Sequence, residues 1–357
     1  MKNYFKNKKI IITGHTGFKG SWLTYWLYLM GAKVIGISKD IPSKPSLYKT
    51  LKLKKKIKDV RLDIRNLNLL KKIFRKYQPD LVFHLAAQSL VKKSYYHPIE
   101  TFTTNTIGTL NIMESIRHIK KRCFSVIITS DKSYKNLEIK RGYHEEDLLG
   151  GKDPYSASKA SAELIIQSYI QSFYKTKKNN KFFAVARAGN VIGGGDWSKD
   201  RLIPDCMKAW SLKKEVKIRN PNSTRPWQHV LEAIRGYLIL IIKLQKNKNL
   251  HGQVFNFGPK NNQDKTVIQL VKEIRKNWKQ ISWIVNKPKK PEYESNLLKL
   301  NSNKAKNKLN WTPLLNFPQT IEMVAIWYKH FYKNNGSKIE QLTKNQIYKY
   351  NKRIKTI

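Results

Sequence analysis

Short apolar runs alternate with segments of helical periodicity along the first two thirds of the chain. The runs are rich in β-branched and aromatic residues and have the length of strands buried on both faces of a sheet. They occupy residues 9–13, 33–38, 57–62, 81–85, 124–129, 182–187 and 254–257, of which residues 57–62 are more polar than the rest. Between them, apolar residues recur three and four positions apart and predict helices at residues 18–30, 67–77, 98–119, 155–174 and 231–244. This alternation predicts the α/β class and a doubly wound parallel sheet.

The alternation loosens after the sixth run. Residues 190–225 are rich in Gly, Pro, Asn and Arg, which is typical of an insertion that contacts a ligand. From residue 266 the pattern indicates a smaller mixed lobe, which ends in a helix at residues 319–332. The residues from 334 onward are polar, and we expect them to be loosely held.

The composition is that of a protein with a substantial core, because 40% of the 357 residues are hydrophobic. The two cysteines, Cys123 and Cys206, exclude a disulfide framework, lack metal-ligand spacing and fit a reducing compartment. The first apolar run is too short for a secretory signal, and residues 237–244 are too short to span a membrane. We therefore expect a cytoplasmic protein with no metal site and no membrane contact.

The net charge is +46, from 70 Lys and Arg against 24 Asp and Glu. Such a charge suits a nucleic acid or another anionic surface. The alternative is a lysine-rich proteome with lysines scattered over a solvated surface, and their presence in nearly every segment favours it. A positive field of this kind would still attract a pyrophosphate substrate.

Gly14, Gly17 and Gly20 form a GxxGxxG turn between the first predicted strand and the first predicted helix. Glycines at these positions let the backbone approach a pyrophosphate, whose charge is favoured at the helix N-terminus. Thr16 and Phe18 belong to the same turn. The strand–turn–helix context favours a dinucleotide site of the Rossmann type over an ordinary tight turn.

Three further segments are candidates for the cofactor site, and each has a structural alternative. Asp40 follows the second strand and would bind a ribose, or be a plain loop residue. Asp63 and Ile64 would line the adenine, although Asp63 is also a candidate helix cap. The segment Leu85-Ala86-Ala87 would let the cofactor pass the end of the fourth strand, or pack in the core. No arginine cluster follows the second strand, so we expect NAD rather than NADP.

Tyr155 and Lys159 are one helical turn apart and share a face of the predicted helix. A lysine cation favours the phenolate, so it lowers the tyrosine pKa from about 10 and makes the phenol a better base. It can also hydrogen-bond a nicotinamide ribose. Ser130, at the end of the fifth strand, would orient the substrate oxygen. A surface helix pair is the alternative, but all three residues after a GxxGxxG turn favour a dehydrogenase centre.

Asp131 and Lys132 are residues that a simple dehydrogenase does not need. A carboxylic acid could protonate a leaving hydroxyl, and a neutral lysine could remove a proton next to a carbonyl group. The alternative is a structural ion pair between the two side chains. Their place at the carboxyl end of a strand, where α/β sheets bind ligands, favours catalysis.

These segments resemble the extended short-chain dehydrogenase/reductase family, in its NAD-dependent epimerase/dehydratase group. The resemblance begins at about residue 9 and reaches the C-terminal region. Its most specific segments are residues 13–22, 84–88, 129–132, 153–156, 187–197 and 225–230. Lys132 stands where dTDP-sugar dehydratases have Glu. Together with the Gly-Gly-Gly-Asp-Trp and Arg-Pro-Trp-Gln-His segments, it favours the branch that acts on CDP-sugars, with CDP-glucose as the substrate.

The resemblance implies a role for each residue of the reacting centre. Tyr155 takes the hydroxyl proton at sugar carbon 4 while hydride passes to a tightly held NAD, and the hydride later returns to carbon 6. Asp131 is the acid and Lys132 the possible base for loss of water across carbons 5 and 6. Two departures from the family pattern, Asn301 for Asp and Ser133 for Cys, lie outside this catalytic set.

The same resemblance implies the substrate contacts. Asn190, Arg201 and Arg225 are expected to bind the sugar nucleotide, with the arginines paired to its pyrophosphate. Arg219 is a weaker candidate for the same role. Gln88 would line the sugar pocket, or merely cap its strand.

On these grounds the chain divides into three parts, which are a dinucleotide-binding domain, a sugar-nucleotide-binding lobe and a polar tail. The domain comprises residues 1–189 and 226–262, the lobe residues 190–225 and 263–335, and the tail residues 336–357. The family usually pairs through the helices at residues 98–119 and 155–174, which implies a homodimer or homotetramer. Two functions compete: another sugar-nucleotide dehydratase or epimerase, and a basic nucleic-acid-binding protein. No aromatic-interleaved basic stripe supports the second of these.

Overall fold

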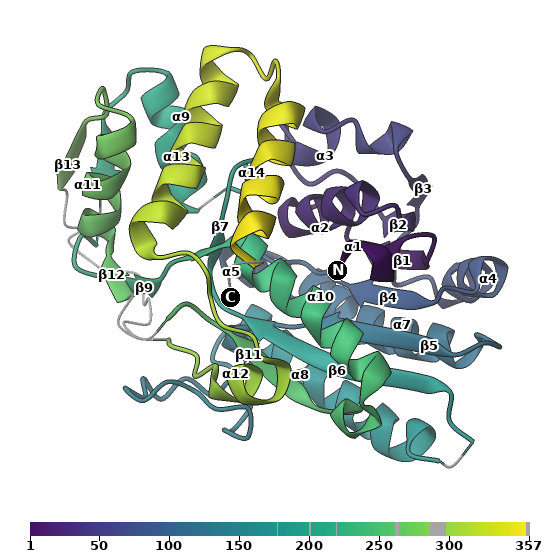
Figure 1. Ribbon diagram of the computed structural model, residues 1–357. Helices are drawn as coiled ribbons and strands as arrows, with labels where there is room; N and C mark the ends of the chain where they lie inside the picture. Colours follow the sequence, from purple (N-terminus) through teal and green to yellow (C-terminus); the bar gives the residue numbers. More distant parts are fainter. Residues whose placement is uncertain (177, 200, 219, 261–263, 286–297, 355–357) are drawn as a thin grey trace.

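The protein is built around a seven-stranded parallel sheet, which a computed structural model shows with the strand order β11-β6-β5-β4-β1-β2-β3 (Figure 1). The structure describes residues 1–176, 178–199, 201–218, 220–260, 264–285 and 298–354. The strands are β1 (Lys9–Thr13), β2 (Lys33–Ser38), β3 (Lys58–Arg61), β4 (Leu81–His84), β5 (Cys123–Ile128), β6 (Lys181–Ala188) and β11 (Val254–Phe257). They are the seven predicted strands, so the predicted fold class is confirmed.

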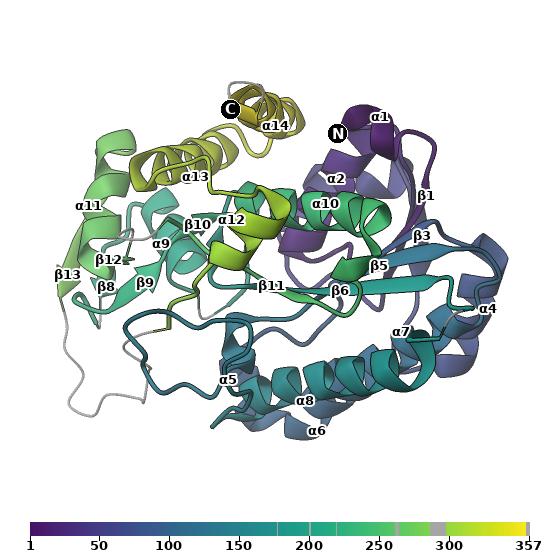
Figure 2. The same cartoon turned by 60° about the horizontal axis from the view of Figure 1, so that its bottom comes forward.

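Helices cover both faces of the sheet (Figure 2). One face is covered by α2 (Phe18–Leu29) and α10 (Val230–Lys246), and the other by α4 (Leu67–Tyr77), α7 (Gly108–Arg117) and α8 (Pro154–Tyr169). Strand β1 shows why its run of isoleucines is unbroken. Ile10 and Ile12 belong to the core on the α2 side, whereas Ile11 belongs to the core on the α8 side. A strand buried on both faces needs apolar residues at every position.

The two long helices predicted beside the sheet are present, but each contains a π-helical turn. The first consists of α6 (Pro98–Phe102), the π turn Thr103–Ile107 and then α7. The second is α8 followed by the π turn Ile170–Tyr174. The turn before α7 carries Asn105. Its side chain accepts a hydrogen bond from the Gln88 backbone N–H at 2.8 Å and donates one to the Ser158 hydroxyl at 2.9 Å. It therefore ties the segment after β4 to α8.

The insertion at residues 190–225 is more ordered than its composition indicates. It contains β7 (Val191–Ile192), α9 (Leu202–Ser211), β8 (Val216–Ile218) and β9 (Thr224–Pro226), and β10 (Gln228–His229) follows. Three two-stranded sheets join the strands β7 to β10, β9 to β12 (Asp264–Thr266) and β8 to β13 (Trp283–Val285). The insertion and the later segment therefore form one lobe at the end of the main sheet, together with α11 (Val267–Asn277) and α13 (Phe317–Lys333) (Figure 1). Helix α12 (Asn303–Leu309) packs against β11 and α10.

The prediction of a loosely held polar tail is wrong. Helix α14 (Ile339–Ile354) packs beside α2 and α10, with Ile347 and Tyr350 buried. The Tyr350 hydroxyl donates to the Glu232 carboxylate at 2.6 Å, and its ring packs edge-on against Trp26. Widely spaced buried residues in a polar sequence gave no continuous apolar stripe to detect. The remaining short helices are α1 (Lys2–Phe5), α3 (Leu47–Thr50) and α5 (Val91–Tyr96). Among the described helices, none is both long and apolar enough to cross a bilayer.

Candidate active site

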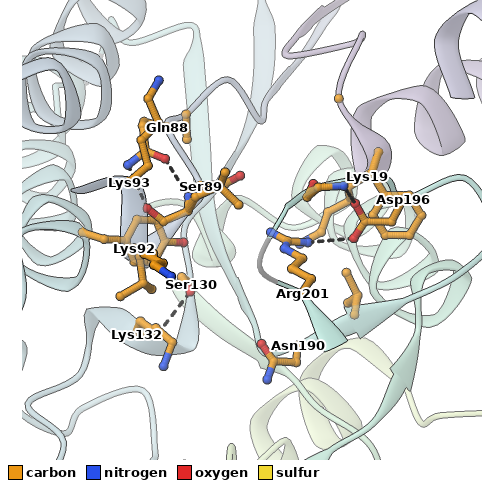
Figure 3. Close-up of a pocket in the computed structure, with 18 of the residues that line it drawn as sticks. Lys19, Gln88, Ser89, Lys92, Lys93, Ser130, Lys132, Asn190, Asp196 and Arg201 are labelled. Atoms are coloured by element: carbon orange, nitrogen blue, oxygen red, sulfur yellow. Dashed lines mark hydrogen bonds and ion pairs between the residues drawn. The ribbon is translucent and has the colours of Figure 1, made fainter. Parts of the chain in front are cut away.

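A cavity of about 2100 Å³ opens at the carboxyl ends of the central strands and is closed on one side by the insertion. Figure 3 shows Gln88, Ser130 and Lys132 on one side of it, and Lys19, Asp196 and Arg201 on the other. All but one of the predicted site residues line this cavity. They are Gly14, Thr16, Gly17, Phe18, Gly20, Asp63, Ile64, Leu85, Ala86, Ala87, Gln88, Ser130, Asp131, Lys132, Tyr155, Lys159, Asn190, Arg201 and Arg225. The exception, Arg219, lies outside the described residues.

The glycine turn is built so that side chains have no room. Gly14 has a φ of +78°, and a Cβ on it would lie 2.7 Å from the Ala86 nitrogen. A Cβ on Gly20 would lie 2.0 Å from the Gly14 carbonyl oxygen. Gly17 is the N-cap of α2, no side chain caps that helix, and its first turn lines the cavity. The turn therefore has the form of an anion site at a helix N-terminus.

A buried histidine holds the ends of β1 and β4 together. The His84 ring contacts the Thr13 hydroxyl at 2.7 Å and the Thr109 hydroxyl at 3.0 Å. Burial lowers the pKa of His84 to about 3, so the ring is neutral. Leu85 and Ala86 donate their amide hydrogens to the Thr13 hydroxyl at 3.2 Å. This fixes the small apolar segment against the glycine turn.

The two acidic candidates near the adenosine end differ from each other. Asp63 pairs with Arg65 at 2.6 Å, and this pair lowers the pKa of the Asp63 carboxyl. The helix-cap alternative for Asp63 is wrong, because Asn66 caps α4 instead. Asp40 accepts a hydrogen bond at its backbone carbonyl from the Thr16 hydroxyl at 2.6 Å. Its position beside the turn is therefore fixed through the backbone.

Tyr155 and Lys159 lie on the first turns of α8, where Asp153 caps the helix by accepting the Ser156 amide at 3.0 Å. Both side chains are buried. Burial raises the pKa of Tyr155, while its hydrogen bond with Ser130 and the Arg201 charge oppose that rise. Burial lowers the pKa of Lys159 to about 8. The expected lowering of the Tyr155 pKa by Lys159 is therefore outweighed by desolvation of the phenolate.

Asp131 is buried at the carboxyl end of β5. The Ser130 hydroxyl donates to its carboxylate at 2.9 Å. Burial raises the pKa of Asp131, although the charges of Lys132 and Lys19 oppose the rise. A raised pKa favours the protonated carboxyl group, which is the form that an acid role requires.

The substrate candidates lie on the lobe side of the cavity, except for Gln88. Arg201 is held at the start of α9 by Asp196, with a distance of 3.0 Å between guanidinium and carboxylate. Arg225 lies on β9, and Asn190 lies between β6 and β7. The Gln88 side-chain amide donates to the Leu90 carbonyl oxygen at 3.0 Å and accepts a hydrogen bond from the Leu90 backbone N–H at 2.6 Å.

Two residues of this site were missed in the sequence, Lys19 and Asp196. The Lys19 amine donates to the Tyr237 hydroxyl at 3.2 Å, across 218 positions of the chain. Burial, with the charges of Arg201 and Lys159, lowers the pKa of Lys19 to about 8. A lysine inside a glycine turn was the available signal. For the ion pair between Asp196 and Arg201, the only signal in the sequence was their separation of five residues.

Known proteins share both the sequence and the fold. The chain matches the family described as GDP-mannose 4,6 dehydratase over residues 11–324. It is 41% identical over 332 residues to CDP-glucose 4,6-dehydratase of Salmonella typhimurium, and the match covers 92% of each chain. The fold is similar to that of the epimerase Mth375 of Methanothermobacter thermautotrophicus, with a TM-score of 0.80, 23% identity and coverage of 93% of this chain and 95% of that one. It is also similar to dTDP-glucose 4,6-dehydratase of Bacillus anthracis in complex with NAD, with a TM-score of 0.74, 23% identity and coverage of 93% and 99%.

Proposed function

We propose that this chain, which belongs to the GDP-mannose 4,6 dehydratase family, is a lyase that converts CDP-glucose to CDP-4-keto-6-deoxyglucose and water. The observation that carries the proposal is the buried set Ser130, Asp131, Tyr155 and Lys159 in one cavity. This set combines an oxidation centre with an acid. The 41% sequence identity to the Salmonella enzyme, over 92% of each chain, supports the choice of substrate.

NAD is the cofactor that fits this cavity. The turn from Gly14 to Gly20 offers backbone N–H groups to its diphosphate, and a Cβ on Gly14 or Gly20 would collide with neighbouring backbone. Lys159 would hold the nicotinamide ribose, and Asp63 and Ile64 would line the adenine end. When bound, NAD would supply the hydride acceptor for oxidation at sugar carbon 4 and the hydride donor for reduction at carbon 6.

Tyr155 takes the proton of the hydroxyl at carbon 4, and the Ser130 hydroxyl orients that oxygen. The Ser130 hydrogen bond and the Arg201 guanidinium both favour the phenolate form of Tyr155. Loss of this proton, together with transfer of the carbon 4 hydride to bound NAD, would leave a keto group at carbon 4, which acidifies the hydrogen on carbon 5. The buried centre excludes water from these charged groups.

Asp131 then donates its proton to the hydroxyl at carbon 6, which leaves as water. The Lys132 amine removes the proton from carbon 5, and a double bond forms between carbons 5 and 6. After carbon 6 is reduced, the Lys132 ammonium returns a proton to carbon 5. The buried carboxyl is suited to the acid step because burial raises its pKa.

Arg201 and Arg225 would pair with the substrate diphosphate from the lobe side of the cavity. The Asp196 carboxylate holds Arg201 in place before substrate arrives. Asn190, at the end of β6, would contact the sugar. Arg219 keeps its proposed role as a weaker contact of the same kind.

Incubation with CDP-, dTDP-, GDP- and UDP-glucose in the presence of NAD tests the proposal directly. The 4-keto products absorb strongly in alkali, so the rate with each substrate can be compared. We expect CDP-glucose to be turned over with the highest kcat/KM. Faster turnover of another nucleotide sugar would assign that sugar instead, and no keto product with any of them would refute the dehydratase.

A Gly14→Ala substitution is expected to abolish NAD binding. The new Cβ would sit in a left-handed conformation and collide with the backbone at Ala86. In the parent protein, NAD at 100 times its Kd should add about 2.7 kcal/mol of stability, and this rise in Tm should vanish in the variant. Gly31→Ala is the matched control, because Gly31 also has a positive φ, of +81°, but a Cβ there would lie no closer than 3.5 Å to Lys6, its nearest neighbour. NAD should still stabilise the Gly31→Ala control. Stabilisation of Gly14→Ala by NAD would contradict our account.

We further propose that the protein forms a homodimer, or a homotetramer that contains the same contact, through the helical segments at residues 98–119 and 155–174. Large apolar side chains are exposed on this side of the sheet, among them Ile99 (76%), Leu164 (57%) and Phe173 (43%). Helices α6 and α8 lie together on this face (Figure 2). Exposed apolar side chains on neighbouring helices are typical of a protein–protein interface.

Ile99→Lys is expected to produce a monomer in light scattering at micromolar concentration, because it places a charge in the centre of the proposed contact. Ile326→Lys is the matched control, since Ile326 is also exposed (40%) but lies on α13 in the lobe. The control should keep the oligomeric state of the parent. A monomeric parent protein would contradict the proposal.

A further inference from the structure

One buried carboxylate near the reacting centre is not among the proposed catalytic groups. Glu163 is two helical turns beyond Tyr155 on α8, and its side chain is 1% exposed. It accepts hydrogen bonds from the Thr129 hydroxyl at 2.7 Å and from the Ser133 hydroxyl at 3.0 Å. It also accepts from the Arg187 guanidinium at 2.8 and 3.0 Å. One side chain on α8 therefore connects the end of β5, the turn after β5 and strand β6.

The partner of this carboxylate is itself held from several sides. Arg187 donates to the Tyr134 hydroxyl at 2.6 Å and to the Glu145 carbonyl at 3.0 Å. Its guanidinium also lies over the Tyr134 ring, 4.4 Å from the centroid. A charge pair with this many hydrogen bonds has one arrangement only, so Glu163 is fixed relative to the sheet.

Two of these contacts lead directly to Ser130. Thr129 precedes it in the chain, and the Ser133 hydroxyl contacts the Ser130 carbonyl oxygen at 2.7 Å as well as Glu163. The turn that presents Ser130 and Asp131 is thus anchored to the same helix that presents Tyr155 and Lys159. Ser133, which departs from the family's usual Cys, is a member of this anchor.

Glu163 also acts on Lys159, one turn before it on α8, through its charge. Burial disfavours the Lys159 ammonium, and Glu163 is the neighbour that opposes this effect. The other charged or titratable groups that face Lys159 come from other elements. They are Lys19 on α2 and the neutral His84 on β4. Tyr155, Asp131 and Arg201 line the same cavity as Lys159. Because the neighbouring Lys19 is also a cation, Glu163 is the charge that stabilises the Lys159 ammonium.

We propose that Glu163 is a positioning residue of the dehydratase, which sets Ser130 against Tyr155 and keeps Lys159 protonated. The inference rests on the proposed function only for the expected effect of Glu163 on kcat. The protonation of Lys159 can be measured without any turnover.

The test is the variant Glu163→Gln, which keeps the shape of the side chain and removes its charge. Lys159 is titrated by competitive labelling with acetic anhydride at a series of pH values, followed by mass spectrometry of its peptide. We expect the pKa of Lys159 to be near 8 in the parent protein. It should fall by about one unit in the variant, since an opposite charge at close range has been removed. The alkaline limb of the kcat profile should move to lower pH by the same amount, with KM changed less than kcat.

Glu145→Gln is the matched control, because Glu145 belongs to the same buried network but is not among the charges that act on Lys159. It should leave the labelling curve and the alkaline limb in place. Glu163→Asp should keep the pKa of Lys159 near that of the parent and still lower kcat, since the shorter side chain no longer reaches all its donors. If Glu163→Gln fails to fold, the pair Glu163→Gln/Arg187→Met removes the uncompensated cation and should show the same shift.

An unshifted Lys159 labelling curve in Glu163→Gln, or in the pair, would overturn the inference whatever the activity. A parent protein that shows the expected curve but no turnover of CDP-glucose would overturn the proposed function alone. The two failures are therefore distinct.

Discussion

Replacement of Tyr155 by phenylalanine is expected to abolish every step of the reaction. The phenol oxygen is the only group removed, and the ring remains in its buried site at the start of α8. Without this base the hydroxyl at carbon 4 keeps its proton, so neither a keto group nor NADH can form. Because oxidation precedes elimination, no later step can compensate. We expect a loss of at least about 10²–10⁴-fold in kcat, with no NADH absorbance on addition of CDP-glucose.

The matched control for this experiment is Tyr169→Phe. Tyr169 is the last residue of the same helix and lies outside the residues that line the cavity. Its loss of a hydroxyl should leave kcat close to that of the parent. Turnover by Tyr155→Phe at a rate near that of the control would assign the base to another group of the cavity.

The sequence was sufficient to predict the sheet, because six of its seven strands are buried along most of their length and have mostly apolar sequences. The exception is the edge strand β3, which is charged and only partly buried. The sequence was also sufficient to predict the glycine turn, since a positive φ at Gly14 and the approach of Ala86 leave no alternative residue. The positions of Ser130, Tyr155 and Lys159 follow from that frame. They lie where a strand ends and where a capped helix begins, and both signals are local.

Contacts between distant segments could not be predicted in this way. Lys19 meets Tyr237 because α2 and α10 pack side by side on one face of the sheet, and no local pattern reports that pairing. Helix α14 was missed because its few buried residues are spaced among lysines and asparagines. The strands of the insertion are two or three residues long, which is below the length that periodicity can detect.

Electrostatics is the second limit, and Tyr155 is the example. Spacing alone places a cation one turn away and predicts a lowered phenol pKa. The structure adds the depth of burial, which raises that pKa and lowers the pKa of Lys159 at the same time. The balance between charge and desolvation depends on every group around the cavity, including Glu163, and so requires the fold.

Asp131→Asn is expected to separate oxidation from elimination. The substitution leaves Ser130, Tyr155 and Lys159 in place, so carbon 4 can still be oxidised and NADH can form. The carboxamide cannot supply the proton that the departing hydroxyl needs, so elimination should slow by about 10²–10⁴-fold. NADH absorbance should therefore accumulate with CDP-glucose in Asp131→Asn, but not in Tyr155→Phe.

The pH dependence of elimination gives this prediction an independent check. Burial raises the pKa of the Asp131 carboxyl, so the acid form persists to higher pH than in water. In the parent protein, elimination should fall as the pH rises through that raised pKa, because the proton donor is lost. The residual elimination of Asp131→Asn should lack this decrease, since a carboxamide does not titrate. If Asp131→Asn instead turns over like the parent and keeps the decrease, the acid lies elsewhere and Asp131 serves as the structural partner of Lys132.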